Sequence, residues 1–228
     1  FKYFFFDWDW RYVSMNSNIT PEIIEKYNTF PWKYRWLSLN VNLTWDFVKK
    51  NLDKDWCWVW LSAGHFINID ILLNNLNLNW DFTELSRNSN IKFKDIINNI
   101  HLPWEYEYLS QHFGLDFEYV KNNLDKEWNW SHISRNYSVK WKYIQNNPDL
   151  PWDWRQVSSN YNIDLNVLKN NMDKPWDFKK LSMNDKIDLD FVKKYSHKNW
   201  SNKLLGMKEF KIDESLEKNK ILEKYAIK

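Results

Sequence analysis

The chain has 228 residues, enough for one large domain or for an extended array of repeats. Its net charge of +2 implies no large electrostatic attraction to nucleic acid or to anionic lipid. Its one cysteine, Cys57, excludes an intrachain disulfide framework. Since no run of about 18 apolar residues occurs, the sequence predicts no membrane span.

Tryptophan recurs at a fixed interval of 24 residues. An internal repeat of this length indicates a solenoid, in which each unit buries its hydrophobic surface against the next unit. We number the positions of the repeat from this tryptophan, which is position 0. The column contains Trp8, Trp32, Trp56, Trp80, Trp104, Trp128, Trp152, Trp176 and Trp200.

Positions 0 to about 7, residues 8–15 in the first repeat, are expected to form a helix that we call helix A. Aromatic residues at position 2 and aliphatic residues at position 5 share one face at helical spacing. Position 6 is always serine, which is small enough to allow close approach of a neighbour. Position 8 holds Asn, Gly or His, which tolerate the left-handed backbone conformation, so we expect a left-handed residue to end helix A there.

A second helix, helix B, is expected from about position 13 to position 19, residues 21–27 in the first repeat. Position 12 before it is mostly Thr, Asn or Asp, the residue types that cap helix N-termini. Positions 13, 16 and 20 form one apolar stripe, as in Trp45, Val48 and Leu52, and position 15 lies on the opposite side. Two apolar faces indicate a helix with neighbours on both sides.

These patterns predict an all-α protein, an αα-hairpin solenoid of about eight repeats over residues 8–199. Residues 1–7 match the end of a preceding repeat. Residues 200–228 are expected to be a C-terminal cap that includes an amphipathic helix. The alternative is a solenoid like that of leucine-rich repeats, which the period of 24 also suits. Polar residues at position 3, such as Arg11 and Arg35, argue against an inward-facing strand there.

The unit resembles the Trp-rich tandem repeats found in proteins of giant, mimivirus-like DNA viruses. The residues that carry the resemblance include "FPWKYRWLSLNVNLTWDFVKKNLDK" (Phe30 to Lys54) and "PWDWRQVSSNYNIDLNVLKNNMDK" (Pro151 to Lys174). It covers about Trp8 to Trp200. The resemblance implies a viral origin, with a location in the host cytoplasm or in the virion, and it implies no activity. The turns at Ala63-Gly64-His65 and Phe113-Gly114 depart from the pattern, so their shapes are expected to differ.

Catalytic and metal-binding motifs are not found in the sequence. The five histidines and the single cysteine have no zinc-site spacing, and no glycine-rich phosphate loop or nucleophile motif occurs. His112 lies in the position-8 column, so a structural role is expected for it. The sequence therefore predicts no enzyme, no metal and no cofactor.

One set of aromatic residues departs from the repeat pattern. Positions 3, 4 and 7 of helix A lie opposite its 2/5 face and are mostly polar in the later repeats. In the first three repeats they include large apolar and aromatic side chains, which are typical of protein-binding hot spots. We expect a partner-binding ridge made of Arg11, Tyr12, Met15, Arg35, Trp36, Leu39 and Trp60. The alternative is that an upstream segment covers this ridge.

The leading hypothesis is a non-enzymatic scaffold that binds another protein, viral or host, through the ridge. The rival is a sequence-tolerant nucleic-acid-binding helical repeat protein, in which position-3 cations contact phosphates. The near-neutral net charge argues against this rival. The oligomeric state is left open by the sequence. The cations at position 3 are Arg11, Arg35, Arg155 and Lys179.

Overall fold

The computed structural model describes residues 7–201 and 205–206. This part of the chain contains sixteen short α-helices and no strand, so the all-α prediction is confirmed and the leucine-rich-repeat alternative is wrong. Helices A and B alternate, and each kind begins again after 24 residues, as Tyr34 and Trp58 illustrate for helix A. None of these helices is long and apolar enough to cross a membrane. The expected C-terminal capping helix lies outside the described residues.

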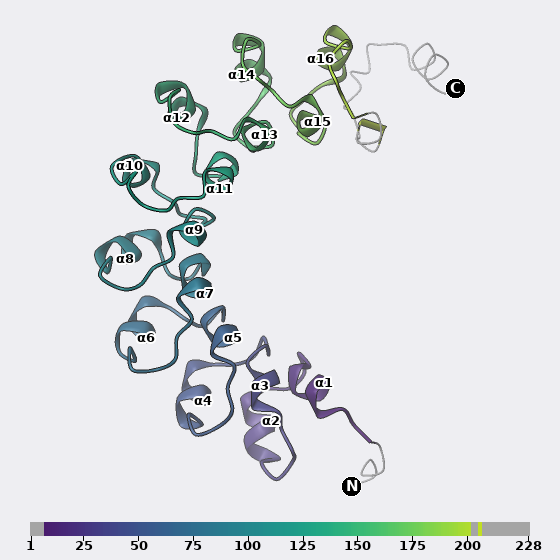
Figure 1. The fold of residues 1–228 in the computed structure, drawn as a ribbon. Helices are drawn as coiled ribbons and strands as arrows, with labels where there is room; N and C mark the ends of the chain where they lie inside the picture. Colours follow the sequence, from purple (N-terminus) through teal and green to yellow (C-terminus); the bar gives the residue numbers. More distant parts are fainter. Residues whose placement is uncertain (1–6, 202–204, 207–228) are drawn as a thin grey trace. The chain divides into compact units, whose positions relative to one another are not determined.

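The chain divides into two compact units, Phe1–Asn129 and Trp130–Lys228. In the first unit, helices A form one row and helices B form a second row (Figure 1). The A row contains α1 (Trp10–Met15), α3 (Tyr34–Leu37), α5 (Trp58–Ser62), α7 (Phe82–Arg87) and α9 (Tyr106–Leu109). The B row contains α2 (Pro21–Lys26), α4 (Trp45–Lys50), α6 (Ile69–Leu73), α8 (Phe93–Asn98) and α10 (Phe117–Lys121).

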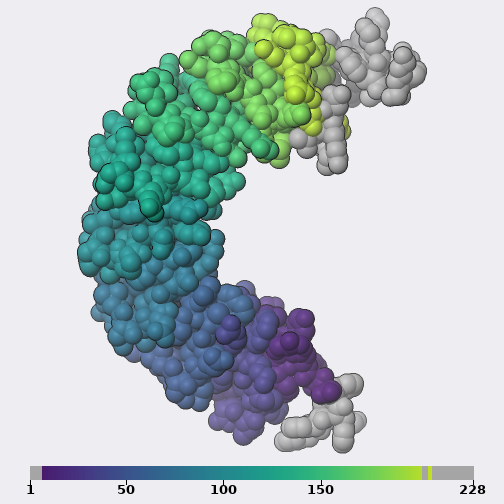
Figure 2. Space-filling view, viewed as in Figure 1, coloured from purple at the N-terminus to yellow at the C-terminus, as the bar shows by residue number. Residues whose placement is uncertain are grey.

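The second unit repeats this arrangement of two rows (Figure 1). Its A row contains α11 (Trp130–Arg135), α13 (Trp154–Val157) and α15 (Phe178–Leu181). Its B row contains α12 (Trp141–Asn146), α14 (Leu165–Asn170) and α16 (Leu189–Lys194). Within each unit the side chains of successive repeats pack into a continuous body (Figure 2). Helices of four to six residues are too short to be stable alone, so this packing must hold them.

Aliphatic side chains fill the space within and between the repeats. Leu37 of helix A, Leu43 of the turn and Val48 of helix B are all buried, and Leu61 is the counterpart of Leu37 in the next repeat. The stripe expected at positions 13, 16 and 20 is wrong at its last member. Leu52 is 40% exposed, because α4 ends at Lys50 and position 20 lies in the turn beyond it.

Helix A begins two residues later than expected, at position 2. The reason is the residue at position 1, which in several repeats is an aspartate that caps the helix. Asp81 accepts a hydrogen bond from the backbone N–H of Glu84, and Asp177 accepts one from that of Lys180, over 2.9 and 3.0 Å. A capping residue lies outside the helix by its backbone conformation. The tryptophan at position 0 therefore precedes helix A.

That tryptophan closes the preceding helix B. The indole N–H of Trp104 donates to the carbonyl oxygen of Asn99, the C-cap residue of α8, over 2.8 Å. Its ring packs edge to face against Phe82, with 5.4 Å between the ring centroids. Trp32 through Trp176 of the column are buried, whereas Trp8 is 52% exposed. The column thus joins one helix B to helix A of the same preceding repeat, which explains its constant phase.

The serine at position 6 connects each repeat to the next. The hydroxyl of Ser158 donates to the carbonyl oxygen of Trp154 over 2.7 Å and accepts from the backbone N–H of Asp177 over 2.8 Å. Asp177 belongs to the following repeat, 19 residues later in the chain. The same acceptor role is played by Ser14, Ser38, Ser62, Ser86, Ser110, Ser134 and Ser182. The serine therefore provides a hydrogen bond as well as a small volume.

The left-handed conformation expected at position 8 is wrong. No residue in the described ranges has a positive φ, and Asn88 is extended, with φ −69° and ψ 114°. The asparagine is instead used for its amide. Asn40 donates from Nδ2 to the carbonyl oxygens of Ser14 and Asn16, over 2.9 and 3.1 Å, and its Oδ1 accepts from the N–H of Asn42. The column thus binds the backbone of the preceding repeat.

Candidate functional site: an aromatic ridge on the helix A row

The seven residues expected to form a ridge all lie on or next to helices A of the first unit. Arg11, Tyr12 and Met15 lie on α1, and Arg35 and Trp36 lie on α3. The other two are Leu39, two residues after the end of α3, and Trp60 of α5. The row comes from three successive repeats, so equivalent side chains follow one another along it. We call these seven residues the ridge.

The ridge is open to solvent to different degrees along its length. Tyr12 is 68% exposed and Leu39 is 43% exposed. Arg11 and Arg35 are exposed, whereas Met15, Trp36 and Trp60 are half-buried. The described residues therefore leave much of this surface uncovered. Whether residues 1–6 cover it is outside the described ranges.

The rings and guanidinium groups of the ridge alternate. The ring centroids of Trp36 and Trp60 are 5.6 Å apart, with 48° between their planes. The Cζ atom of Arg11 lies 6.0 Å from the ring centroid of Tyr12 and 6.0 Å from that of Trp36. Arg35 lies 5.9 Å from the ring of Trp60 in the same way. Distances near 6 Å are in the range of cation–π attraction, so the ridge is held together by its own members.

The two arginines of the ridge differ in charge balance. Arg11 donates from Nη2 and Nε to the carboxylate of Asp9, over 2.6 and 3.0 Å. These hydrogen bonds and the attraction of opposite charges lower the pKa of Asp9 and raise the pKa of Arg11. Arg35 forms no ion pair with any described residue. Arg35 is therefore the ridge cation left for an acidic group of a partner.

The same kind of contact continues further along the row than the sequence suggested. Arg87 of α7 lies over the ring of Tyr108 of α9, at 5.6 Å from the centroid, and forms an ion pair with Glu84. This contact joins position 7 of one repeat to position 4 of the next. Comparison of like positions could not find it, whereas a search for Arg followed 21 residues later by an aromatic residue would have.

The described residues contain no group of three or more His, Cys, Asp or Glu side chains arranged to hold a metal ion. His112 illustrates the structural use of such residues. Its Nε2 lies 2.8 Å from the carbonyl oxygen of Ile91, and its Nδ1 accepts from the N–H of Gly114. It thus takes the place of the position-8 asparagine, as expected from its column.

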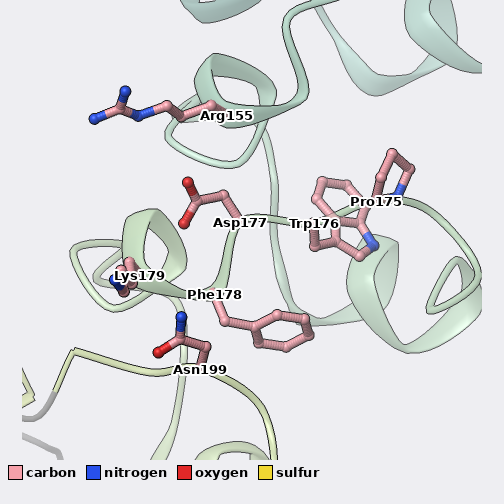
Figure 3. Close-up of a pocket in the computed structure, with 7 residues that line it drawn as sticks. All are labelled: Arg155, Pro175, Trp176, Asp177, Phe178, Lys179 and Asn199. Carbon is pink, nitrogen blue, oxygen red and sulfur yellow. The ribbon is translucent and has the colours of Figure 1, made fainter.

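A hollow of about 490 Å³ lies in the second unit, on helices α13 and α15 (Figure 3). It is lined by Arg155, Pro175, Trp176, Asp177, Phe178, Lys179 and Asn199. Arg155 and Lys179 belong to the position-3 column, like Arg11 and Arg35 of the ridge. The hollow is treated separately below, because it lies in the other unit.

The chain was compared with known proteins by sequence and by structure. No protein-family model, no curated protein and no solved structure matches it.

Proposed function

We propose that this chain is a non-enzymatic repeat scaffold that binds another protein through the aromatic ridge. The single observation that carries the proposal is the row of Tyr12, Trp36 and Trp60 with intercalated arginines on one side of the first unit. Aromatic residues and arginine dominate the binding energy of protein interfaces. The resemblance to giant-virus repeat proteins adds a setting, which is the host cytoplasm or the virion.

The ridge also defines the chemistry of the partner. Its rings offer apolar area that loses water on contact, and the guanidinium of Arg35 is free to pair with a carboxylate. The rings are already packed against each other, so little conformational entropy is lost when a partner covers them. The proposed partner is therefore a protein surface that combines apolar side chains with at least one acidic side chain.

Nucleic-acid binding is less well supported. It would require the position-3 cations to contact successive phosphates. Arg11 is held by Asp9, Arg35 is held over Trp60, and position 3 of the next repeat is Val59, which is uncharged. A row of phosphate contacts along the first unit is therefore interrupted after its second member.

The test is affinity capture with the double variant Trp36→Glu/Trp60→Glu. Wild-type and variant chains are used as bait in lysate from virus-infected cells, with and without nuclease, and bound proteins are identified by mass spectrometry. We expect a protein that survives nuclease treatment and is lost with the variant. Tyr12→Ala serves as a second variant, because Tyr12 is highly exposed and its loss leaves the core unchanged.

The matched control is Gln156→Glu/Gln145→Glu, which adds the same two negative charges outside the ridge. Gln156 occupies position 4, as Trp36 and Trp60 do. Circular dichroism must show equal helicity for all variants. Equal capture by the wild type and both ridge variants would refute the proposal. Capture that disappears with nuclease would favour the nucleic-acid alternative instead.

A further inference from the structure

The hollow in the second unit has a basic rim. Arg155 of α13 and Lys179 of α15 occupy equivalent positions in consecutive repeats and both line the hollow (Figure 3). Both side chains are exposed, and neither forms an ion pair with a described residue. The side-chain amide of Asn199 provides a further donor on the same hollow. The site thus combines two free cations with one neutral hydrogen-bond donor.

The nearby carboxylates are already engaged by the helix backbone. Asp153 accepts from the N–H of Gln156 over 3.1 Å, and Asp177 accepts from that of Lys180 over 3.0 Å. Each aspartate lies two residues before a rim cation, the same spacing as Asp9 and Arg11. In that pair the carboxylate turns to the guanidinium, whereas here it caps the helix. The cations are therefore left without a counterion because of the way the helices are capped.

The rest of the hollow is apolar and firmly positioned. The indole N–H of Trp176 donates to the carbonyl oxygen of Asn171 over 2.7 Å, so the ring is fixed from behind. Phe178 packs edge to face against Trp200 at 5.0 Å, and the ammonium of Lys198 lies 5.5 Å from the Phe178 ring. A volume of about 490 Å³ is in the range of small-molecule sites.

We propose that this hollow binds a phosphate monoester, with Arg155 and Lys179 on the phosphate oxygens. A guanidinium matches two oxygens of a phosphate and an ammonium adds a second positive charge, which together balance a dianion. The carboxylate of Asp177 is drawn between the two cations in Figure 3 and disfavours weaker, singly charged ligands. A diester chain would need a longer basic track, but position 3 of the preceding repeat is Ser131, which is uncharged.

The test is isothermal titration calorimetry of the full chain at low salt, with phenyl phosphate as the probe. The variant Arg155→Gln/Lys179→Gln removes both cations. The control variant Arg135→Gln/Lys169→Gln removes one arginine and one lysine that are exposed elsewhere in the same unit. We expect saturable binding that weakens roughly tenfold or more in the rim variant and stays within about twofold in the control.

Two further probes identify the source of the monoester and exclude other anions. A phosphotyrosine peptide that binds more tightly than phenyl phosphate would support a phosphorylated protein ligand, whereas equal binding would support a small phosphorylated molecule. The proposal is overturned by equal weakening in both variants, by absence of saturable binding to the wild type, or by tighter binding of a short single-stranded DNA oligonucleotide. None of these outcomes depends on the ridge, so this site and the proposed function fail or hold separately.

Discussion

The side-chain amide of Asn160 donates a hydrogen bond over 2.9 Å to the carbonyl oxygen of Ser134, 26 residues earlier in the chain. The same Nδ2 atom lies 3.2 Å from the carbonyl oxygen of Asn136 and 3.4 Å from that of Val139. On the other side, Oδ1 accepts from the N–H of Asn162 over 2.8 Å. One buried amide thus satisfies backbone groups of two repeats, and the same residue type recurs in the position-8 column.

Asn160→Ala is therefore expected to destabilise the second unit by about 2–4 kcal/mol, because it leaves buried carbonyl and N–H groups without partners. Asn160→Asp is expected to be at least as damaging, since it keeps the acceptor but places a carboxylate against carbonyl oxygens. The midpoint of urea unfolding measures both. Asn166→Ala, at an exposed position of α14, is the control and should change the free energy of unfolding by less than about 0.5 kcal/mol. An Asn160→Asp variant as stable as wild type would contradict this account of the column.

The serine column makes a second prediction about the joints between repeats. Ser158→Ala removes the acceptor for the N–H of Asp177, and the site is fully buried. The expected cost is about 1–3 kcal/mol, the penalty for a buried donor left unsatisfied. Ser159→Ala is the neighbouring control, because Ser159 is exposed and bonds only within its own helix. Equal unfolding midpoints for the two variants would show that position 6 is serine for its size alone.

The architecture could be predicted because a tryptophan at constant spacing is visible in the letters of the sequence. Its physical cause is also local, since each indole closes a helix only five residues earlier, as Trp104 does at Asn99. The role of the asparagine column could not be predicted in this way. Asparagine tolerates a left-handed backbone and also carries an amide, and residue type alone does not distinguish the two uses. The choice depends on the backbone of the preceding repeat, which lies 24–26 residues away.

The ridge was partly predictable for the same reason. Tyr12, Trp36 and Trp60 share position 4, so their order along the row follows from the repeat. The contacts of the arginines do not follow from it, because Arg11 reaches forward to Trp36 while pairing with Asp9. The free cations of the hollow could not be found from spacing. Asp153 and Arg155 have the same separation as Asp9 and Arg11, and only the capping hydrogen bond distinguishes the two pairs.

Helix B offers a prediction on burial. Val48 is fully buried in α4, whereas Leu52 lies in the following turn and is 40% exposed. Val48→Ala is expected to lower the free energy of unfolding by about 1–3 kcal/mol through lost contacts and the cavity left behind. Leu52→Asn, which introduces the residue found at this position in the first repeat, should change it by less than about 0.5 kcal/mol. Thermal unfolding followed by circular dichroism compares the two, and a larger shift for Leu52→Asn would restore position 20 to the core stripe.

His112 makes the stability of the first unit depend on pH. Only 2% of its surface is exposed, and burial lowers its pKa more than the hydrogen bond to the carbonyl of Ile91 raises it. The folded chain also needs the neutral ring, because Nδ1 accepts from the N–H of Gly114. Since the pKa in the folded state lies below the unfolded value of about 6.5, the contribution of His112 is complete above that value. It is lost as the pH falls through about 6.5 toward the folded-state pKa.

The measurement is urea unfolding of wild type and His112→Asn at about pH 7.5 and about pH 5. Asparagine is the residue at this position in five other repeats, where its amide donates to carbonyls and accepts an N–H, as Asn88 does with Ser62 and Asn90. We expect the variant to keep these hydrogen bonds and to lose the part of the acid sensitivity that is due to His112. The carboxylates titrate alike in both chains, so their contribution cancels in the difference. If wild type and His112→Asn lose the same stability on acidification, then protonation of His112 does not oppose folding and the ring must accept a proton without breaking its bond to Gly114.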